Sequence, residues 1–526
     1  MALGPTLGTG VFIGAGQALA IGGPASLLVA YVFLSLLTYF MATTVAEVAT
    51  HAPARHGTLV TNGFQYLTNS MGFAAGILRW YTLAMFVPYE ITTAVVNLGL
   101  WNPGSTIAAR LSILMTLIVA CNFLPERHFR SSERLFTRIK IGTLISLLVL
   151  SLSIGYGGAT GHDKWGFCYW RKPGAMHEYL THGPLGKFWG LLQCVLHSSI
   201  AFTFVPELIV HRAETLESAR ETEIGEELDP AIQARIPRQV AIDTATTALP
   251  YILSSLAMGV MAPYDDPLLT NNGAGAGLSP YIIGMNTARI RIVSVTATIA
   301  ILLSSVASAR SFLYLASRTL CAMSELGHAH QVFKVRNQWG VPYVAVSVSA
   351  LFTPLAFVSV RISSSVAITY FLLFVNSSGY LSWLVSCAIS RSFRQRLRLC
   401  HNSRSYRFAI QPLGTHIGTL MSGILLMSNG LAGGVPGPLP GSRTSRLVAA
   451  YISIPIFALL YFAHRFRTMI PDRAFHHTQE GHNNKEEECG KGVAEVVHPQ
   501  QGRPSAQPVS PETIEMNQVW SMAMEA

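Results

Sequence analysis

Long apolar segments alternate along this chain with short polar segments that are rich in arginine. A helix needs roughly 20 apolar residues to cross a bilayer, and about twelve segments approach that length. They are 2–21, 26–49, 72–99, 106–124, 133–157, 188–212, 240–262, 290–320, 342–361, 364–391, 413–434 and 446–464. The pattern predicts an all-α polytopic membrane protein with about 12 transmembrane helices.

The first segment differs from an ordinary spanning helix because it is crowded with glycine. Glycine weakens a helix by about 1 kcal/mol relative to alanine, so Gly8-Thr9-Gly10 is a candidate break. Peptide groups freed at membrane depth need a polar cavity or a protein cover, and broken helices hold small charged substrates in many transporters. A helix that uses its small residues for close packing fits the same pattern.

Composition supports a membrane protein and argues against binding to nucleic acid. Of 526 residues, 50% are hydrophobic and 12% are charged, whereas soluble domains carry about 25% charged residues. The net charge is +10, but the basic residues fall in short loops. There they indicate topology and contact with the lipid bilayer.

Arginine in the short loops predicts that both termini are cytosolic. Clusters follow the fourth, tenth and twelfth segments, which share one side if the count is twelve. We expect residues 1–470 to form the transmembrane domain and the polar residues 471–526 to be a disordered cytosolic tail. Glu214 to Arg235 is expected to be an acidic cytosolic loop.

Three ionisable residues fall within or near the apolar segments, where a charge is costly and usually functional. Glu90 follows Pro88, Lys140 begins the fifth segment, and Glu207 follows Pro206 in the sixth. Burial shifts the pKa of such groups toward neutrality, which proton coupling requires. Each has a structural alternative: Glu90 as a cap or ion pair, Lys140 extending to the cytosolic interface, and Glu207 as the polar end of a helix.

Motifs of most enzyme classes are absent from the sequence. It has no phosphate-binding loop, dinucleotide fingerprint, zinc spacing or serine-centred nucleophile elbow. We therefore expect no catalytic residues, no cofactor and no metal.

Several blocks, in order along residues 2 to about 465, resemble the fungal amino acid permease family of the amino acid–polyamine–organocation superfamily. They include Leu7-Gly-Thr-Gly-Val-Phe-Ile-Gly14, Pro88-Tyr-Glu90 and Ala262-Pro-Tyr-Asp-Asp-Pro267. Further matches are Gly166–Gly174, Ser308–Leu320, Gly340-Val-Pro-Tyr343 and Tyr451–Ile456. The blocks are specific jointly rather than singly.

The resemblance implies a leucine-transporter-like fold with a 5+5 inverted repeat plus two C-terminal helices. It also implies a substrate site, a proton-linked group and amino acid import driven by the proton gradient. The substrate carboxylate would bind near Thr6, Gly8, Thr9 and Gly10, and its ammonium near the carbonyls of Ala201, Phe202 and Thr203. Lys140 would tie the fifth helix to the first break, and Glu90 and Glu207 match acidic positions, with Glu90 preferred for proton coupling.

Two features depart from the family pattern. The sixth segment reads Phe202-Thr-Phe-Val-Pro-Glu207, one residue shorter than the family's Phe-Ser-x-x-Gly-x-Glu, and Pro5 replaces a usual glycine. Met1 falls inside the first expected helix, so we expect that helix to be truncated at its start.

The leading hypothesis is a proton-coupled amino acid symporter that works by alternating access, most plausibly in the plasma membrane. An exchanger or facilitator would use the same site without net proton movement, and a transport-inactive sensor would bind without uptake. The sequence leaves the amino acid carried and the oligomeric state open.

Overall fold

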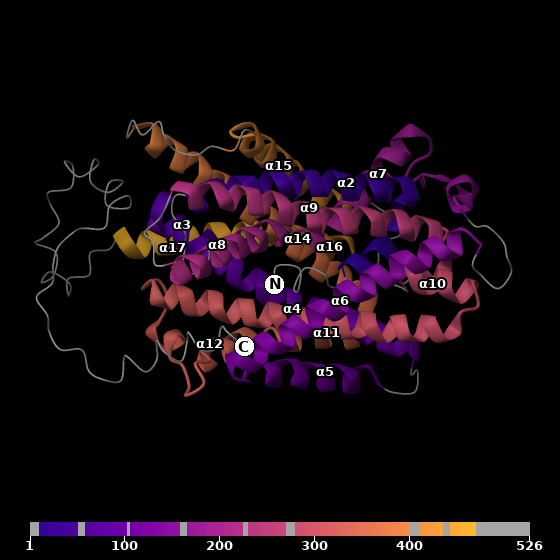
Figure 1. The fold of residues 1–526 in the computed structure, drawn as a ribbon, viewed down its shortest axis with the longest axis horizontal. Coiled ribbons are helices and arrows are strands. Elements are labelled where there is room, and N and C mark those ends of the chain that lie inside the picture. The colour runs from indigo at the N-terminus through magenta and orange to yellow at the C-terminus, as the bar shows by residue number, and fades with distance from the viewer. Residues whose placement is uncertain are drawn as a thin grey trace, which may run out of the picture. The chain divides into compact units, whose positions relative to one another are not determined.

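The computed structural model describes residues 10–50, 58–101, 106–157, 166–224, 230–269, 279–399, 408, 410–434 and 442–469. These residues contain helices and no strand, and Figure 1 shows the long helices lying alongside one another. The α-helices are α2 (Ala15–Ala49), α3 (Thr58–Tyr66), α4 (Asn69–Trp101), α5 (Ile107–Asn122), α6 (Glu126–Gly155), α7 (Pro184–Ser198), α8 (Val205–Ile224), α9 (Pro230–Met261), α10 (Pro280–Thr287), α11 (Arg291–Glu325), α12 (Tyr343–Ala350), α13 (Val358–Arg361), α14 (Ser364–Leu399), α15 (Leu413–Gly434), α16 (Arg443–Tyr451) and α17 (Ser453–Met469). Shorter π and 3-10 turns are η1 (Gly10–Gly14), η2 (Trp170–Gly174), η3 (Ser199–Ala201), η4 (Pro267–Leu269), η5 (Gln331–Lys334) and η6 (Thr353–Phe357).

The prediction of an all-helical membrane protein is confirmed, while the count of twelve stays a prediction. Among the described residues, 8 helices are long and apolar enough to cross a membrane, or 9 if the bent pair α16–α17 is one span. By this measure Gly10–Ala49 is a single run of 40 residues, although it contains part of the first expected segment, 2–21, and all of the second, 26–49. Helix α5 is apolar but shorter than the others.

A sharp turn divides α2 where the sequence has Gly22-Gly23-Pro24. Gly23 has φ 80° and ψ 172°, a conformation outside the helical region that favours glycine. Pro24 follows as the first residue of the next helical segment, where its missing N–H costs little. The run Gly10–Ala49 is therefore two helices joined by a turn.

The helices bury both apolar and polar side chains between them, and several of them also expose apolar side chains at the surface. Helix α4 lies along α11, and α2 lies along α7 and α9. On α6 the side chains of Glu133 and Lys140 are buried, while Val149 and Leu152 are 58% and 61% exposed. Exposed apolar surface of this kind is typical of a lipid-facing helix.

Three expectations are changed or left open by the fold. Helix α8 continues to Ile224, so the prediction of a loop beginning at Glu214 is wrong for its first part. Polar residues there are compatible with helix, and hydropathy alone does not separate the two. The short helices α3 and α10 were not expected. Thr6, Gly8, Thr9 and the tail from residue 470 lie outside the described residues.

Candidate functional site

The sixth expected segment is interrupted at its middle, as its sequence suggests. The α-helix α7 ends at Ser198, η3 has 3-10 geometry, and a turn precedes α8. Pro206 has no N–H to donate to the carbonyl four residues earlier, that of Phe202, and its ring would crowd that carbonyl. The Val205 N–H bonds to the Phe202 carbonyl instead, at 3.1 Å. Pro206 then lies in the first turn of α8, where proline is tolerated.

The first segment also departs from α geometry, and it meets the sixth at this interruption. Residues Gly10–Gly14 form the π-helical turn η1, a form frequent at functional sites. A Cβ placed on Gly10 would lie 3.3 Å from Ile200 Cγ2 and 3.4 Å from Ala201 Cα. The structure therefore brings Gly10 and Ala201 side by side. Both had been assigned to the substrate site.

The other two assigned residues of the sixth segment face neighbouring helices. The Phe202 ring packs edge-on against Tyr31 of α2 and Tyr251 of α9, with centroids 5.6 and 5.2 Å away. The Thr203 carbonyl accepts a hydrogen bond of 2.9 Å from Trp383 Nε1 of α14. All five side chains are buried, so the interruption is enclosed by protein.

A second aromatic group borders the same turn. Phe204 lies 5.5 Å from Phe86 of α4, which stacks on Phe312 of α11 at 4.4 Å. These buried rings, Phe204 of the turn itself with one ring from α4 and one from α11, give the turn an apolar wall.

Glu207 lies in the first turn of α8 and pairs with a cation. Its carboxylate contacts Arg79 of α4 and accepts a hydrogen bond of 3.2 Å from Ser382 of α14. A carboxylate is favourable at a helix N-terminus. The sequence pattern missed Arg79 because it sits in an apolar helix, nine positions before the more conspicuous Pro88-Tyr-Glu90 segment.

Lys140 is buried inside the protein rather than extended to its surface. Its Nζ donates to Ser308 Oγ of α11 at 2.7 Å. Glu133 and Glu90 lie close enough to attract the ammonium, and Arg310 close enough to repel it. Residues before Gly10 lie outside the described part, so the expected link from Lys140 to the first break stays a prediction.

A charged seam, defined as Glu126, Glu133 and Lys140 of α6 with their partners on α11, joins these two helices. Its central contact is a buried ion pair of 2.6 Å between Arg310 Nη2 and Glu133 Oε2. The guanidinium also lies over the Phe129 ring at 4.2 Å. The three α6 residues recur every seven positions and so share a helix face, a signal that the sequence reading did not use.

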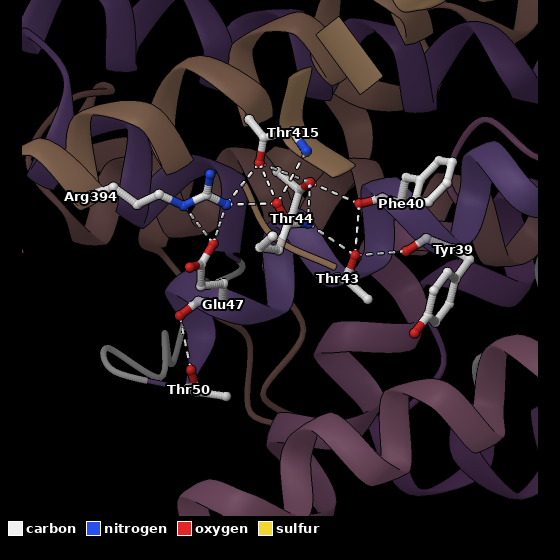
Figure 2. Close-up of polar contacts among 9 residues, drawn as sticks. Tyr39, Phe40, Thr43, Thr44, Glu47, Thr50, Arg394 and Thr415 are labelled. Atoms are coloured by element: carbon white, nitrogen blue, oxygen red, sulfur yellow. Dashed lines mark hydrogen bonds and ion pairs between the residues drawn. The ribbon is translucent and has the colours of Figure 1, made fainter. Parts of the chain in front are cut away.

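A polar cluster joins α2, α14 and α15, as Figure 2 shows. Arg394 of α14 donates through Nε to Glu47 of α2 at 2.9 Å, and through Nη2 to Thr415 of α15 at 2.8 Å. Gln411 accepts from the same Nη2 at 2.7 Å and donates to Thr44 at 3.0 Å. The charges of Glu47 and Arg394 are thereby compensated, which identifies the cluster as a structural junction.

The loop before α7 is bonded to the turn inside α2. The His177 N–H donates to the Gly22 carbonyl at 3.0 Å, and the His177 ring lies 3.0 Å from the Ile21 carbonyl. In the same loop, a hydrogen bond from the Gly183 N–H lowers the pKa of the Glu178 carboxyl. This loop therefore covers the end of the first segment that precedes Gly23.

Comparison with solved structures shows the fold. A manganese transporter from Eremococcus coleocola aligns with a TM-score of 0.51 at 14% identity, covering 89% of this chain and 93% of its own. Mutant forms of that transporter align with TM-scores of up to 0.52. The chain has the leucine-transporter-like fold that the sequence comparison implied.

Comparison with curated proteins identifies the activity class. A probable proline-specific permease of Schizosaccharomyces pombe is 32% identical over 465 residues, covering 87% of this chain and 81% of the relative. Proline-specific permeases of Emericella nidulans and Saccharomyces cerevisiae are each 30% identical, covering 83% and 74% of those relatives. These relatives are named as permeases rather than enzymes.

The family model described as "Amino acid permease" matches residues 1–472. That match spans every described helix, including both interrupted segments and the charged seam. The protein is an integral membrane protein of amino acid transport, and the chain belongs to the amino acid permease family.

Proposed function

We propose that this permease imports amino acids by proton-coupled symport with alternating access. The observation that carries the proposal is the contact between η1 and η3, where two interrupted spans meet inside the protein. Free peptide groups at such a junction can bind both ends of a zwitterion. The substrate carboxylate would bind N–H groups around Thr6, Gly8, Thr9 and Gly10.

The ammonium would bind carbonyl oxygens of the sixth segment. The carbonyls of Phe202 and Thr203 already accept hydrogen bonds from Val205 and Trp383. We therefore assign the principal ammonium contact to the Ala201 carbonyl. Its position beside Gly10 would let one small substrate reach both segments.

The substrate class we propose is a small neutral amino acid, with L-proline as the first candidate. Three similar proteins are named for proline specificity. The ring wall of Phe86, Phe204 and Phe312 offers an apolar surface and no charge to a substrate side chain.

For the coupled proton we propose the carboxylate of Glu90. Glu90, Glu133, Lys140 and Arg310 are all buried and interact electrostatically as two anions and two cations. Adding one proton to Glu90 would leave this balanced group with one net positive charge. The ion pairs of the group would then be weakened, so its structure would depend on protonation. Glu207 is the second candidate, and its release from Arg79 would accompany proton uptake.

We also propose a plasma-membrane location with both termini cytosolic. The arginine-rich loops support this orientation. Uptake would then be driven by the proton gradient across the plasma membrane.

The test is uptake of labelled L-proline at external pH 5 and pH 7 by cells lacking their own proline carriers. Symport predicts faster uptake at the lower pH and loss of that difference in Glu90→Gln. Glu178→Gln, which alters a carboxyl in the outer loop, is the matched control and should keep the wild-type pH dependence.

Other outcomes would select the competing functions. Uptake that ignores pH but rises with internal proline would indicate exchange. Binding without uptake would indicate a sensor. Either result would overturn the symport proposal.

A further inference from the structure

One face of α14 supplies hydrogen bonds to the interrupted segment. Asn376 Nδ2 donates to the Leu196 carbonyl at 2.7 Å, and Trp383 Nε1 donates to the Thr203 carbonyl at 2.9 Å. Between them, the Tyr380 hydroxyl lies 2.5 Å from Ser199 Oγ. Positions separated by four and then three residues share a helix face, so the three side chains form one row.

This row matches the places where the sixth segment leaves α geometry. Leu196 lies in the last turn of α7, Ser199 begins η3, and Thr203 lies in the turn before α8. Carbonyls at such a discontinuity lose their helical donors. In an apolar interior, an unpaired carbonyl costs several kcal/mol, so outside donors are needed to keep this segment out of the α form.

The row is also held very close to the segment. Gly379 lies between Asn376 and Tyr380, and a Cβ placed on it would lie 2.3 Å from Thr203 Cγ2. Asn376, Tyr380 and Trp383 are each no more than 1% exposed. The contact is therefore packed and dry, with little freedom for the three donors to rearrange.

The three donors are uncharged. Asn376 and Trp383 donate to backbone carbonyls, and the Tyr380 hydroxyl shares a hydrogen bond with the Ser199 hydroxyl. None of the three adds a formal charge beside the segment, where it would act on a substrate ammonium. A lysine or arginine in the row would repel that ammonium.

We propose that Asn376, Tyr380 and Trp383 are positioning residues for the amino acid site. They act through the backbone of residues 196–203, fix the direction of the Ala201 carbonyl, and do not touch the substrate themselves. The inference rests on the proposed function only in placing the ammonium at that segment.

The test compares Trp383→Phe and Tyr380→Phe with the wild-type protein, purified in lipid nanodiscs. Each variant keeps an aromatic ring and removes one polar hydrogen. Tyr370→Phe removes a hydroxyl from the same helix outside the row and is the matched control. Equilibrium binding of tritiated L-proline and hydrogen–deuterium exchange of residues 199–205 are measured on the same preparations.

Leaving the Thr203 carbonyl without its donor should raise the Kd of Trp383→Phe about tenfold. Amide exchange at Phe202 and Val205 should become faster in both row variants and remain unchanged in Tyr370→Phe. A purely structural role would lower thermal stability without a localised change in exchange or Kd.

A double-mutant cycle isolates the Tyr380 contact. Ser199→Ala and Tyr380→Phe remove the same interaction, so their combined effect on Kd should be smaller than the product of the single effects. Independent, multiplicative effects would contradict the contact's role.

The outcomes separate this inference from the proposed function. Unchanged exchange and unchanged Kd in both row variants would overturn the positioning role while leaving proton-coupled uptake intact. Uptake that does not depend on pH would overturn symport, while a raised Kd in the row variants would still support the positioning role. If wild type does not bind proline, the proposed substrate is wrong, and the exchange of residues 199–205 decides on positioning alone.

Discussion

Two buried polar regions of this permease are stabilised in opposite ways. At the interrupted sixth span, neutral side chains of α14 donate to backbone carbonyls. At the charged seam between α6 and α11, ion pairs such as Glu133–Arg310 stabilise the contact. Both regions are shielded from solvent, and both tie distant segments together.

The difference follows from what each region holds. A zwitterion brings its own two charges, so a nearby fixed charge would bind one end and repel the other. If the sixth segment binds the substrate as we propose, neutral donors are the better way to hold it. The seam instead surrounds Lys140, whose buried ammonium requires anions nearby. The nearby carboxylates compensate the charge of the buried ammonium, which supports our proposal that the coupled proton binds in this group.

The largest expected effect comes from removing one member of the buried ion pair. Arg310→Met leaves Glu133 buried without its cation and should destabilise the protein by about 3–5 kcal/mol. Thermal unfolding of the purified protein, followed by size-exclusion chromatography, measures the loss.

The control for that change is an accessible pair between the last residue of α11 and the loop that follows η5. Arg336 pairs with Glu325 of α11 at 2.5 Å with about half of the arginine side chain exposed. Arg336→Met should cost less than about 1 kcal/mol. Equal losses of stability in Arg310→Met and Arg336→Met would show that the buried ion pair contributes no more than the accessible one.

A smaller effect is expected from crowding the α14 contact. Gly379→Ala places a methyl group against Thr203 and should cost about 1–3 kcal/mol through overpacking. Binding of proline should weaken together with stability, because the displaced segment contains the proposed ammonium site. Gly142→Ala on α6, where an added Cβ meets nothing within 4 Å, is the control. Gly142→Ala should retain wild-type binding, and a similar loss there would contradict the packing argument.

The smallest effect concerns the neutral partner of Lys140. Ser308→Ala removes one hydrogen bond from an ammonium that keeps its anionic neighbours, so the expected cost is about 1 kcal/mol. Ser305→Ala removes a hydroxyl bonded within α11, to the Ile301 carbonyl at 3.0 Å, and should cost less. Differential thermal stability of the two variants checks the order. A larger loss in Ser305→Ala would argue against a special role for Ser308.

Local features were readable from the sequence because they depend on neighbouring residues. Runs of apolar residues predicted that the chain forms membrane helices, and the gap between the segments 2–21 and 26–49 coincides with the turn at Gly23 in α2. Pro206 marked the interruption of the sixth segment, since a missing N–H acts within one helical turn. The roles assigned to Glu90, Lys140 and Glu207 stay predictions, although each side chain is buried.

Partners across the fold were not readable in this way. Glu47 and Arg394 are 347 positions apart, and Glu133 and Arg310 are 177 apart. Which cation meets which carboxylate depends on the order, depth and rotation of packed helices. A single sequence supplies charges and helix faces, but not the neighbour that each face meets.

What the sequence determined by itself was therefore that the chain forms apolar membrane helices, and that the sixth segment is interrupted near Pro206. The tertiary structure alone decided that Gly10 meets Ala201, that α14 supplies the donors for the sixth segment, and that Arg79 meets Glu207. The physical reason is the distance along the chain over which each interaction acts. Backbone geometry is set by a few adjacent residues, whereas buried polar groups find their partners on helices that are brought together only by folding.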